Sequence, residues 1–136
     1  MDTQLIMSVM GIDVLYAERS CPADWVMGRE SCIRMLAEEV AERWFPGLGA
    51  VLAASALSRE AEEATYLGRG LAVPHARVAG LSAAAVLVMR DASVPWPTEP
   101  ADCGVLLCVP EEMPELHLQL LSRVVRWRSK GGELVF

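Results

Sequence analysis

Two short apolar runs, separated by a proline-rich segment, constrain the fold more than any other feature of the chain. The runs are SAAAVLVMR (residues 82–90) and CGVLLCVP (residues 103–110). Their length, their valine and leucine content, and their boundaries of glycine, proline or charge favour buried strands over helices. We therefore expect them to form the middle of a β-sheet. The segment between them, DASVPWPTEPAD, contains three prolines and predicts a surface loop without regular structure.

Two segments that precede these strands predict α-helices. In RESCIRMLAEEVAERWF (residues 29–45), apolar side chains recur at helical spacing between charged ones. This helix should end before Pro46, because a proline disfavours helical backbone in the residue that precedes it. AVLAASALSREAEEA (residues 50–64) is rich in strong helix formers and predicts a second helix that ends at about residues 59–63.

The remaining elements complete an alternating pattern of strands and helices. GLAV (residues 70–73) predicts a short strand, and a last helix begins near Pro114. That helix places four apolar side chains on one face, namely Leu116, Leu120, Val124 and Trp127. Helices that interleave with buried strands indicate an α/β architecture. We expect a single domain over residues 1–136, with a mixed β-sheet flanked by α-helices on both faces.

Charge and hydropathy argue against several classes of protein. The net charge is −6, and Lys130 is the only lysine, whereas a dedicated nucleic-acid-binding protein normally carries a basic face. The longest apolar run, residues 83–89, is far shorter than the roughly 18 to 20 residues of a transmembrane helix. The N-terminal stretch has no basic segment before its apolar part, so it does not predict a secretory signal. We expect a cytoplasmic protein that neither binds nucleic acid nor is embedded in a membrane.

The four cysteines are irregularly spaced and mostly stand among apolar neighbours, which is typical of reduced cysteines in a cytosolic protein. A zinc site is the alternative, with Cys103, Cys108, His75 and His117 as its four ligands. Zinc ligands usually occur in pairs such as C-x-x-C or H-x-x-x-H, and the sequence contains neither spacing. We therefore predict no metal and no cofactor.

The stretch GRGLAVPHARV (residues 68–78) contains the first of the two histidines. Pro74 fixes its own φ and offers no N–H to a sheet, so we expect a strand to stop there and His75 to lie at its end. In open α/β sheets ligands collect outside strand ends. Gly68 and Gly70 would let backbone N–H groups approach an anion closely.

The second histidine, His117, falls in the first turn of the last predicted helix. A helix N-terminus carries partial positive charge and unpaired N–H donors, which suits a phosphoryl group. Three acidic residues crowd the same turn, Glu111, Glu112 and Glu115. The residues alone leave two further interpretations open, a structural histidine at a strand end and a histidine on the surface of a helix.

Two segments of the sequence resemble a known family. SREAEEATYLGRGLAVPHARV (residues 58–78) is similar to the active-site segment of the enzyme IIA domains of the bacterial phosphoenolpyruvate-dependent sugar phosphotransferase system, in the fructose/mannitol/nitrogen-regulatory class. VLLCVPEEMPELHLQLLSRVVR (residues 105–126) resembles the second signature of that family, a strand followed by a helix with the second histidine. The two segments occur in the order of the family and at a similar separation.

The resemblance implies a role for three side chains. The histidine of the PH motif accepts the phosphoryl group on a ring nitrogen, which implies this role for His75. The histidine of the following helix supports the phosphoryl group, which implies this role for His117. The arginine of the RE pair also belongs to the site and is Arg59 here. An arginine at a helix end that pairs with Glu62 or Glu63 is the alternative interpretation of Arg59.

The family also implies the partners. The donor would be the histidine phosphocarrier protein, and the acceptor an enzyme IIB component in sugar uptake. A regulatory domain that acts on a transporter or a transcription regulator according to its phosphorylation is the second hypothesis. The sequence departs from its relatives at Arg69 and Ala76, and relatives usually continue further at the C-terminus. The alternatives there are a shortened domain and one that pairs with a second chain, as in a homodimer.

Overall fold

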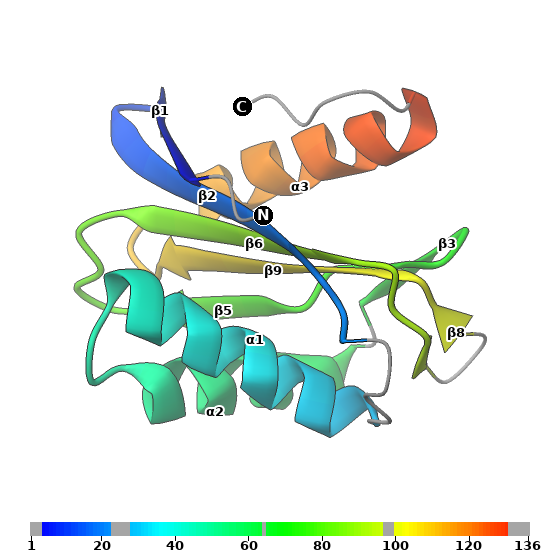
Figure 1. The fold of residues 1–136 in the computed structure, drawn as a ribbon. Coiled ribbons are helices and arrows are strands. Elements are labelled where there is room, and N and C mark those ends of the chain that lie inside the picture. The colour runs from blue at the N-terminus through cyan, green and yellow to red at the C-terminus, as the bar shows by residue number, and fades with distance from the viewer. Residues whose placement is uncertain (1–3, 23–27, 64, 97–99, 131–136) are drawn as a thin grey trace.

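The computed structural model describes residues 4–22, 28–63, 65–96 and 100–130. It shows an α/β arrangement in which a mixed β-sheet lies between helices (Figure 1). Helices α1 (Arg29–Trp44) and α2 (Gly49–Glu62) cover one face of the sheet, and α3 (Pro114–Lys130) covers the other. The predicted fold class, with helices on both faces of a mixed sheet, is confirmed.

The main sheet has the strand order β1-β2-β6-β9-β4-β3, and β5 also pairs with β9. Its strands are β1 (Gln4–Val9), β2 (Ile12–Ser20), β3 (Tyr66–Gly68), β4 (Leu71–Ala72), β5 (His75–Val78), β6 (Ala84–Arg90) and β9 (Cys103–Pro110). β2 runs parallel to β6, and β4 and β5 both run parallel to β9, whereas β6 and β9 are antiparallel. The two strands predicted for the middle of the sheet therefore lie there.

The three predicted helices are also present. α1 ends at Trp44, just before Pro46, and α2 ends at Glu62. α3 begins at Pro114, and the four side chains predicted to share its apolar face are all buried. None of the helices formed by the described residues is long and apolar enough to cross a membrane.

The sheet separates two apolar cores, and alternate residues of β9 point into different ones. Val105 and Leu107 pack with the apolar face of α3. Leu106 and Cys108 pack on the other side, with the buried faces of α1 and α2. This alternation follows from the two-residue repeat of a strand. It explains why the central run is apolar at every position, because both faces of β9 are covered by helices.

One element was not predicted, and two expectations for strands and loops are wrong. The N-terminal hairpin of β1 and β2 was not anticipated. The proline-rich segment, predicted to lack regular structure, contains the paired short strands β7 (Val94–Pro95) and β8 (Pro100–Ala101). Prolines are tolerated there because each of these two-residue strands pairs only with the other, outside the main sheet.

The second wrong expectation concerns His75, which begins strand β5 rather than lying beyond the end of a strand. Pro74 removes one N–H donor, but its carbonyl oxygen still accepts a hydrogen bond from the backbone N–H of Leu107 at 3.0 Å. β4 and β5, which lie on either side of the proline in the sequence, therefore both pair with β9. The expected shortening at the C-terminus concerns residues 131–136, which lie outside the described residues.

Candidate active site

A pocket of about 360 Å³ lies where the C-terminal end of α2, strand β5 and the N-terminal half of α3 meet. Its wall contains Arg59, Glu62, Glu63, Thr65, Leu67, His75, Arg77, His117 and Leu121. The three site residues that the family resemblance implies thus come from three different elements and line one pocket. They are separated by up to 58 positions in the sequence (117 minus 59), so only the fold brings them together.

The register of β5 aims its two polar side chains at α3. His75 lies opposite Leu107 and Arg77 lies opposite Val109, and both of these partners belong to the core beneath α3. Ala76 lies between them opposite Cys108 and points into the other core. Because neighbouring strands in register direct paired residues to the same face, the imidazole and the guanidinium emerge on the side of α3.

The two imidazole rings contact one another. The ring centroids of His75 and His117 are 4.2 Å apart, and the ring planes are inclined by 48°. His117 is almost completely buried, at 6% exposure, whereas His75 is half-buried. The prediction that His117 lies in the first turn of the last helix is confirmed. Its side chain faces the pocket, so the hypothesis of a surface histidine is wrong.

Arg77 connects strand β5 to both neighbouring helices. Its Nη2 lies 3.3 Å from Nδ1 of His117 in α3. Its backbone N–H donates to Oγ of Ser55 in α2 at 2.9 Å, and the same hydroxyl donates to the backbone oxygen of Arg77 at 3.0 Å. Ser55 thus satisfies the two backbone groups that β5 turns away from β9, and it fixes the position of Arg77.

Burial and positive charge keep both histidines neutral. Burial, followed in order of effect by the nearby His117, Arg77 and Arg59, lowers the pKa of His75 to about 4. Burial also lowers the pKa of His117, with Arg77 and Arg59 as the next causes. A neutral imidazole carries a lone pair on one ring nitrogen and a proton on the other, so each ring can offer a nucleophile, an acceptor or a donor according to its contacts.

The pocket wall contains an unusual concentration of unsatisfied polar atoms. Among the described residues, the buried side-chain nitrogens and oxygens without a hydrogen-bond partner are His75 Nδ1, Arg77 Nε, His117 Nε2 and Trp44 Nε1. Three of these four atoms belong to the pocket. Because buried polar groups are normally paired, such a cluster indicates a site prepared for a polar ligand.

Arg59 lies in the last turn of α2 and faces this pocket. Its guanidinium makes no hydrogen bond or ion pair with any of the described residues. The alternative in which it pairs with Glu62 or Glu63 is therefore not observed, although both carboxylates line the pocket and are exposed. Arg59 and Arg77 leave the pocket with two guanidinium groups that no carboxylate of the described residues neutralises by direct contact.

Residues 26–131, well over half of the chain, match the model of the family described as phosphoenolpyruvate-dependent sugar phosphotransferase system, EIIA 2. The chain belongs to this family. The resemblance to enzyme IIA of the fructose/mannitol/nitrogen-regulatory class, inferred from the two sequence segments, is confirmed. A comparison with curated protein sequences found no significant match.

Solved structures show the same enzyme IIA fold. The nitrogen regulatory protein IIA-Ntr from Neisseria meningitidis has 24% identity and a TM-score of 0.69, over 84% of this chain and 78% of the other. Enzyme IIA-Mtl in its complex with phosphorylated enzyme IIB-Mtl from Escherichia coli has 16% identity and a TM-score of 0.64, over 82% and 78%. The IIA mannitol crystal structure from Escherichia coli has 17% identity and a TM-score of 0.61, over 82% and 80%.

A buried carboxylate, missed in the sequence, supports the pocket of this enzyme IIA domain. Glu60 is 5% exposed and accepts hydrogen bonds from the backbone N–H and the hydroxyl of Thr65. It also accepts from Nε1 of Trp96 at 3.0 Å and lies 3.7 Å from Nη1 of Arg29. Since successive helical residues point about 100° apart, the residue after Arg59 turns away from the pocket toward the core. This 100° step from Arg59 is the one feature of the sequence that could have indicated a buried Glu60.

The acidic residues at the start of α3 leave the pocket free. Glu111, Glu112 and Glu115 are exposed, and none of them lines the pocket. Glu112 accepts a hydrogen bond from the backbone N–H of Gly80 at 3.0 Å. The three carboxylates therefore make no direct contact with the pocket in which a phosphoryl group would lie.

The anion-binding role considered for Gly68 and Gly70 is not supported by the geometry. Both have positive φ, +90° and +78°; Gly68 ends β3, and Gly70 lies in the turn that leads to β4. The backbone N–H of Gly70 donates to the hydroxyl of Tyr66 at 2.7 Å. A side chain at position 70 would meet the carboxylate of Asp102, with its first carbon 2.5 Å from Oδ1. The glycine is needed for the turn and for this close approach.

The alternative of a zinc site is wrong, because two of its four expected ligands point to opposite faces of the sheet. Cys103 and Cys108 lie an odd number of positions apart in β9, so Cys103 points into the core beneath α3 and Cys108 into the core beneath α1 and α2. All four cysteines are free thiols. Within the part of the chain that the structure describes, no group of three or more histidine, cysteine or acidic side chains is arranged to hold a metal ion.

Proposed function

We propose that this chain is a cytoplasmic phosphocarrier that accepts a phosphoryl group on His75 from the histidine phosphocarrier protein. The observation that supports the proposal best is the cluster of unpaired buried nitrogens on His75, Arg77 and His117 around one pocket. Membership of the enzyme IIA family supplies the chemical class, phosphoryl transfer within the phosphoenolpyruvate-dependent sugar phosphotransferase system.

The reacting atom we assign is Nε2 of His75. Its Nδ1 is enclosed by the protein, so an incoming phosphoryl group has access to the other ring nitrogen. The lone pair of Nε2 forms the new P–N bond, and the P–N bond to the donor imidazole breaks with its electron pair returning to the donor ring. The proton of the attacking neutral ring stays on Nδ1. Transfer between two imidazoles needs no other reactant and is reversible.

His117 and Arg59 would stabilise the transferring group. A phosphoryl group in transfer carries negative charge on its peripheral oxygens, and fixed donors aimed at those oxygens lower the barrier. The guanidinium of Arg59 has no partner among the described residues and faces the pocket. Positioning and charge compensation by these side chains suffice in principle, so the proposal involves no metal.

The acceptor we propose is an enzyme IIB component in sugar uptake. A solved complex of enzyme IIA-Mtl with phosphorylated enzyme IIB-Mtl has the same fold in its IIA part, which supports a partner of this kind. The second candidate is a regulatory domain that binds a transporter or a transcription regulator according to its phosphorylation. The fold overlap with the nitrogen regulatory protein, at a TM-score of 0.69, is the observation that favours it.

The direct experiment incubates the full chain with phosphoenolpyruvate, enzyme I and the histidine phosphocarrier protein, followed by intact mass measurement. We expect one acid-labile phosphoryl adduct on the unmodified sequence, none on His75→Gln, and slower labelling of His117→Gln. A chain that takes up no phosphoryl group, or an adduct that survives His75→Gln, contradicts the proposal.

A second step separates the carrier from the regulator. The isolated phosphorylated chain is mixed with the enzyme IIB components of the same cell, and the mass of each protein is followed. A carrier loses its adduct to an enzyme IIB component. A regulator keeps its adduct in that mixture and binds another protein in only one of its two phosphorylation states.

A further inference from the structure

Arg77 makes an unusual contact, because its partner is an imidazole nitrogen that must accept the hydrogen bond. A guanidinium has only N–H donors, so at 3.3 Å the Nη2 of Arg77 donates to Nδ1 of His117. Nδ1 therefore carries its lone pair rather than a proton. In a neutral imidazole the single ring proton is then on Nε2. A protonated His117 would present an N–H to the guanidinium at the same position and would be repelled by it.

The consequence is a buried N–H donor without an acceptor. Nε2 of His117 has no hydrogen-bond partner in the part of the chain that the structure describes, and it is enclosed at the pocket wall. The ring of His75 lies 4.2 Å away between centroids. Leaving a buried donor unpaired is costly to a protein, so such a group usually has a ligand in the working state. A phosphoryl oxygen on His75 is an acceptor at this position.

We propose that Arg77 is a positioning residue that holds His117 in one tautomer, with the proton on Nε2, so that this N–H donates to the phosphoryl group on His75. The role of the N–H rests on the proposed function, whereas the tautomer is a property of the unmodified protein. Ser55 completes the arrangement, because its hydroxyl binds both backbone groups of Arg77 and fixes the strand from which the guanidinium extends.

The chemistry favours this role over direct neutralisation of charge alone. Second groups that hydrogen-bond a functional histidine fix its tautomer and the orientation of its ring. In such pairs the second group is commonly an acceptor, which places the proton on the nearer nitrogen. Here the second group is a donor, so the proton is placed on the farther nitrogen, the one that faces the pocket.

The test uses nitrogen NMR of the full chain with ¹⁵N-labelled histidine, before any phosphorylation. The chain has only two histidines, so the spectrum of His75→Gln assigns His117. We expect His117 to be almost entirely the tautomer protonated on Nε2. In Arg77→Met, which keeps much of the length of the side chain but no donor, both tautomers should be present. Arg77→Lys, which keeps a charged donor, should restore the single tautomer at least in part.

The matched control is Arg126→Met, an exposed arginine of α3 that does not line the pocket, and it should leave the spectrum unchanged. The proposal is overturned if His117 of the unmodified sequence carries its proton on Nδ1, or if Arg77→Met has the same tautomer as the unmodified sequence. If Arg77→Met fails to fold, the unmodified sequence and Arg77→Lys still decide, because a proton mainly on Nδ1 of His117 in either of them contradicts the assignment.

A rate measurement links the tautomer to transfer. Arg77→Met should slow phosphoryl uptake by at least about tenfold, as the loss of one transition-state donor does, while the final adduct remains on His75. Failure of the unmodified sequence to take up a phosphoryl group contradicts the proposed function without changing the NMR result. An Arg77→Met variant with mixed tautomers and an unchanged rate contradicts the role of the N–H in transfer.

Discussion

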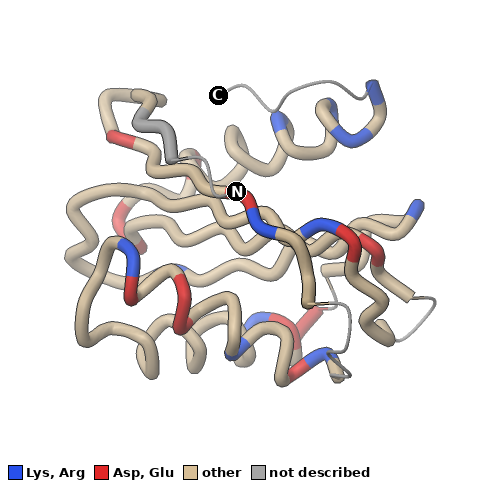
Figure 2. The backbone as a smooth tube through the Cα atoms, viewed as in Figure 1, with Lys and Arg blue, Asp and Glu red and all other residues tan. Residues whose placement is uncertain are grey.

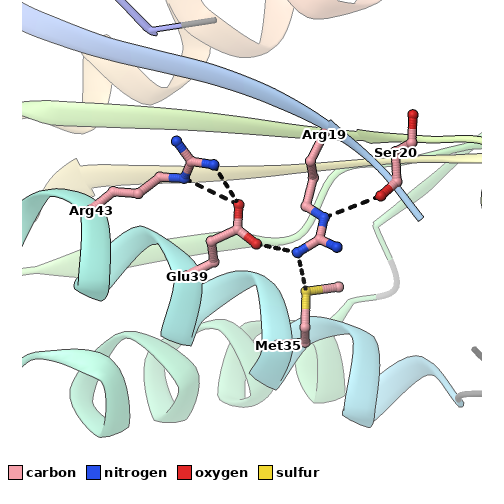
Figure 3. A network of polar contacts seen from close by, with 5 residues as sticks. All are labelled: Arg19, Ser20, Met35, Glu39 and Arg43. Atoms are coloured by element: carbon pink, nitrogen blue, oxygen red, sulfur yellow. Dashed lines mark hydrogen bonds and ion pairs between the residues drawn. The ribbon is translucent and has the colours of Figure 1, made fainter. Parts of the chain in front are cut away.

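Two pairs of arginines in this molecule have opposite surroundings. Arg19 of β2 and Arg43 of α1 both bind the carboxylate of Glu39 (Figure 3). Arg19 also donates from Nε to the backbone oxygen of Ser20 at 3.2 Å. Arg59 and Arg77 face the pocket, and neither has a carboxylate partner among the described residues. An arginine side chain is thus paired with a carboxylate in one region and left without such a partner in the other.

The two pairs differ in whether a carboxylate of the protein already binds the donors of the guanidinium. A partly exposed ion pair contributes at most about 1 kcal/mol to stability, and the donors that face its carboxylate are already engaged. An unpaired guanidinium in a pocket contributes nothing comparable to stability, yet its donors stay available for an anion. Figure 2 shows basic and acidic residues interspersed along α1 and α2, so net charge alone does not distinguish the two regions. The partners of each side chain do.

The largest effect on phosphoryl uptake should come from removing the guanidinium of Arg59, which has no partner among the described residues. Arg59→Met should lower the rate of phosphoryl uptake by about 100-fold to 1,000-fold, because a fixed donor to the transferring group is lost. Its free energy of unfolding should change by less than about 0.5 kcal/mol. Arg19→Met is the matched control and should leave the rate unchanged. Equal losses of rate in the two variants, measured in one donor assay, would remove the distinction between the two regions.

A matched pair of carboxylates extends the comparison to stability. Glu60→Gln places an amide among the three donors from Thr65 and Trp96 and should lower the free energy of unfolding by about 2–3 kcal/mol, because at least one buried donor loses its acceptor. Glu39→Gln, in the more exposed cluster, should cost less than about 1 kcal/mol. Chemical denaturation of both variants measures the two values. A larger loss in Glu39→Gln contradicts this ranking.

The pocket should also weaken the fold in mild acid. Since the pKa of His75 is lowered from 6.5 to about 4, the unfolded chain binds a proton between these pH values that the folded chain does not. Stability contributed by the neutral ring is therefore complete above the unfolded pKa and is lost as the pH falls through this window. His117 shifts in the same direction.

His75→Gln removes this titration, so its stability should fall less than that of the unmodified sequence between about pH 7 and about pH 5. Denaturant midpoints at the two pH values measure the difference. Arg19→Met again serves as the control and should keep the pH dependence of the unmodified sequence. An identical pH dependence in His75→Gln is the outcome that contradicts a buried neutral histidine.

The smallest effect concerns an arginine that belongs to neither pair. Arg69 is exposed, lies outside the pocket wall and has a φ of +54°, a backbone conformation that L residues adopt with strain. Arg69→Asn should raise the free energy of unfolding by about 0.5–1 kcal/mol, because asparagine tolerates this conformation better. The same change at helical Arg126 should lower it by a few tenths of a kcal/mol. Neither should alter phosphoryl uptake, and a slower rate in Arg69→Asn would place this arginine in the site.

The periodicity of the sequence predicted the parts of the fold that bury apolar surface. The central strands β6 and β9 and the helices α1, α2 and α3 follow from runs and repeats of apolar residues. The N-terminal hairpin was missed because β2 has an irregular burial pattern, with neither strict alternation nor a continuous apolar run. Strand β5 is not evident in the sequence because a proline usually ends a strand, whereas Pro74 removes only one donor position here.

The candidate site could be predicted only in part. His75, His117 and Arg59 were named from the family resemblance, since residue chemistry alone left structural roles open for each of them. The contact of Arg77 with His117 joins residues 40 positions apart, and no local pattern indicates it. Glu60 was also missed, because Trp96 lies 36 positions away and only the folded chain brings it to the carboxylate beside the local donors of Thr65.

The central claim is that Nε2 of His75 is the phosphoryl acceptor. It is tested most directly by NMR of the phosphorylated full chain with ¹⁵N-labelled histidine, in which coupling between phosphorus and nitrogen identifies the bonded atom. We expect coupling to Nε2 of His75 and an unmodified ring on His117. Coupling to either nitrogen of His117, or to Nδ1 of His75, would contradict it.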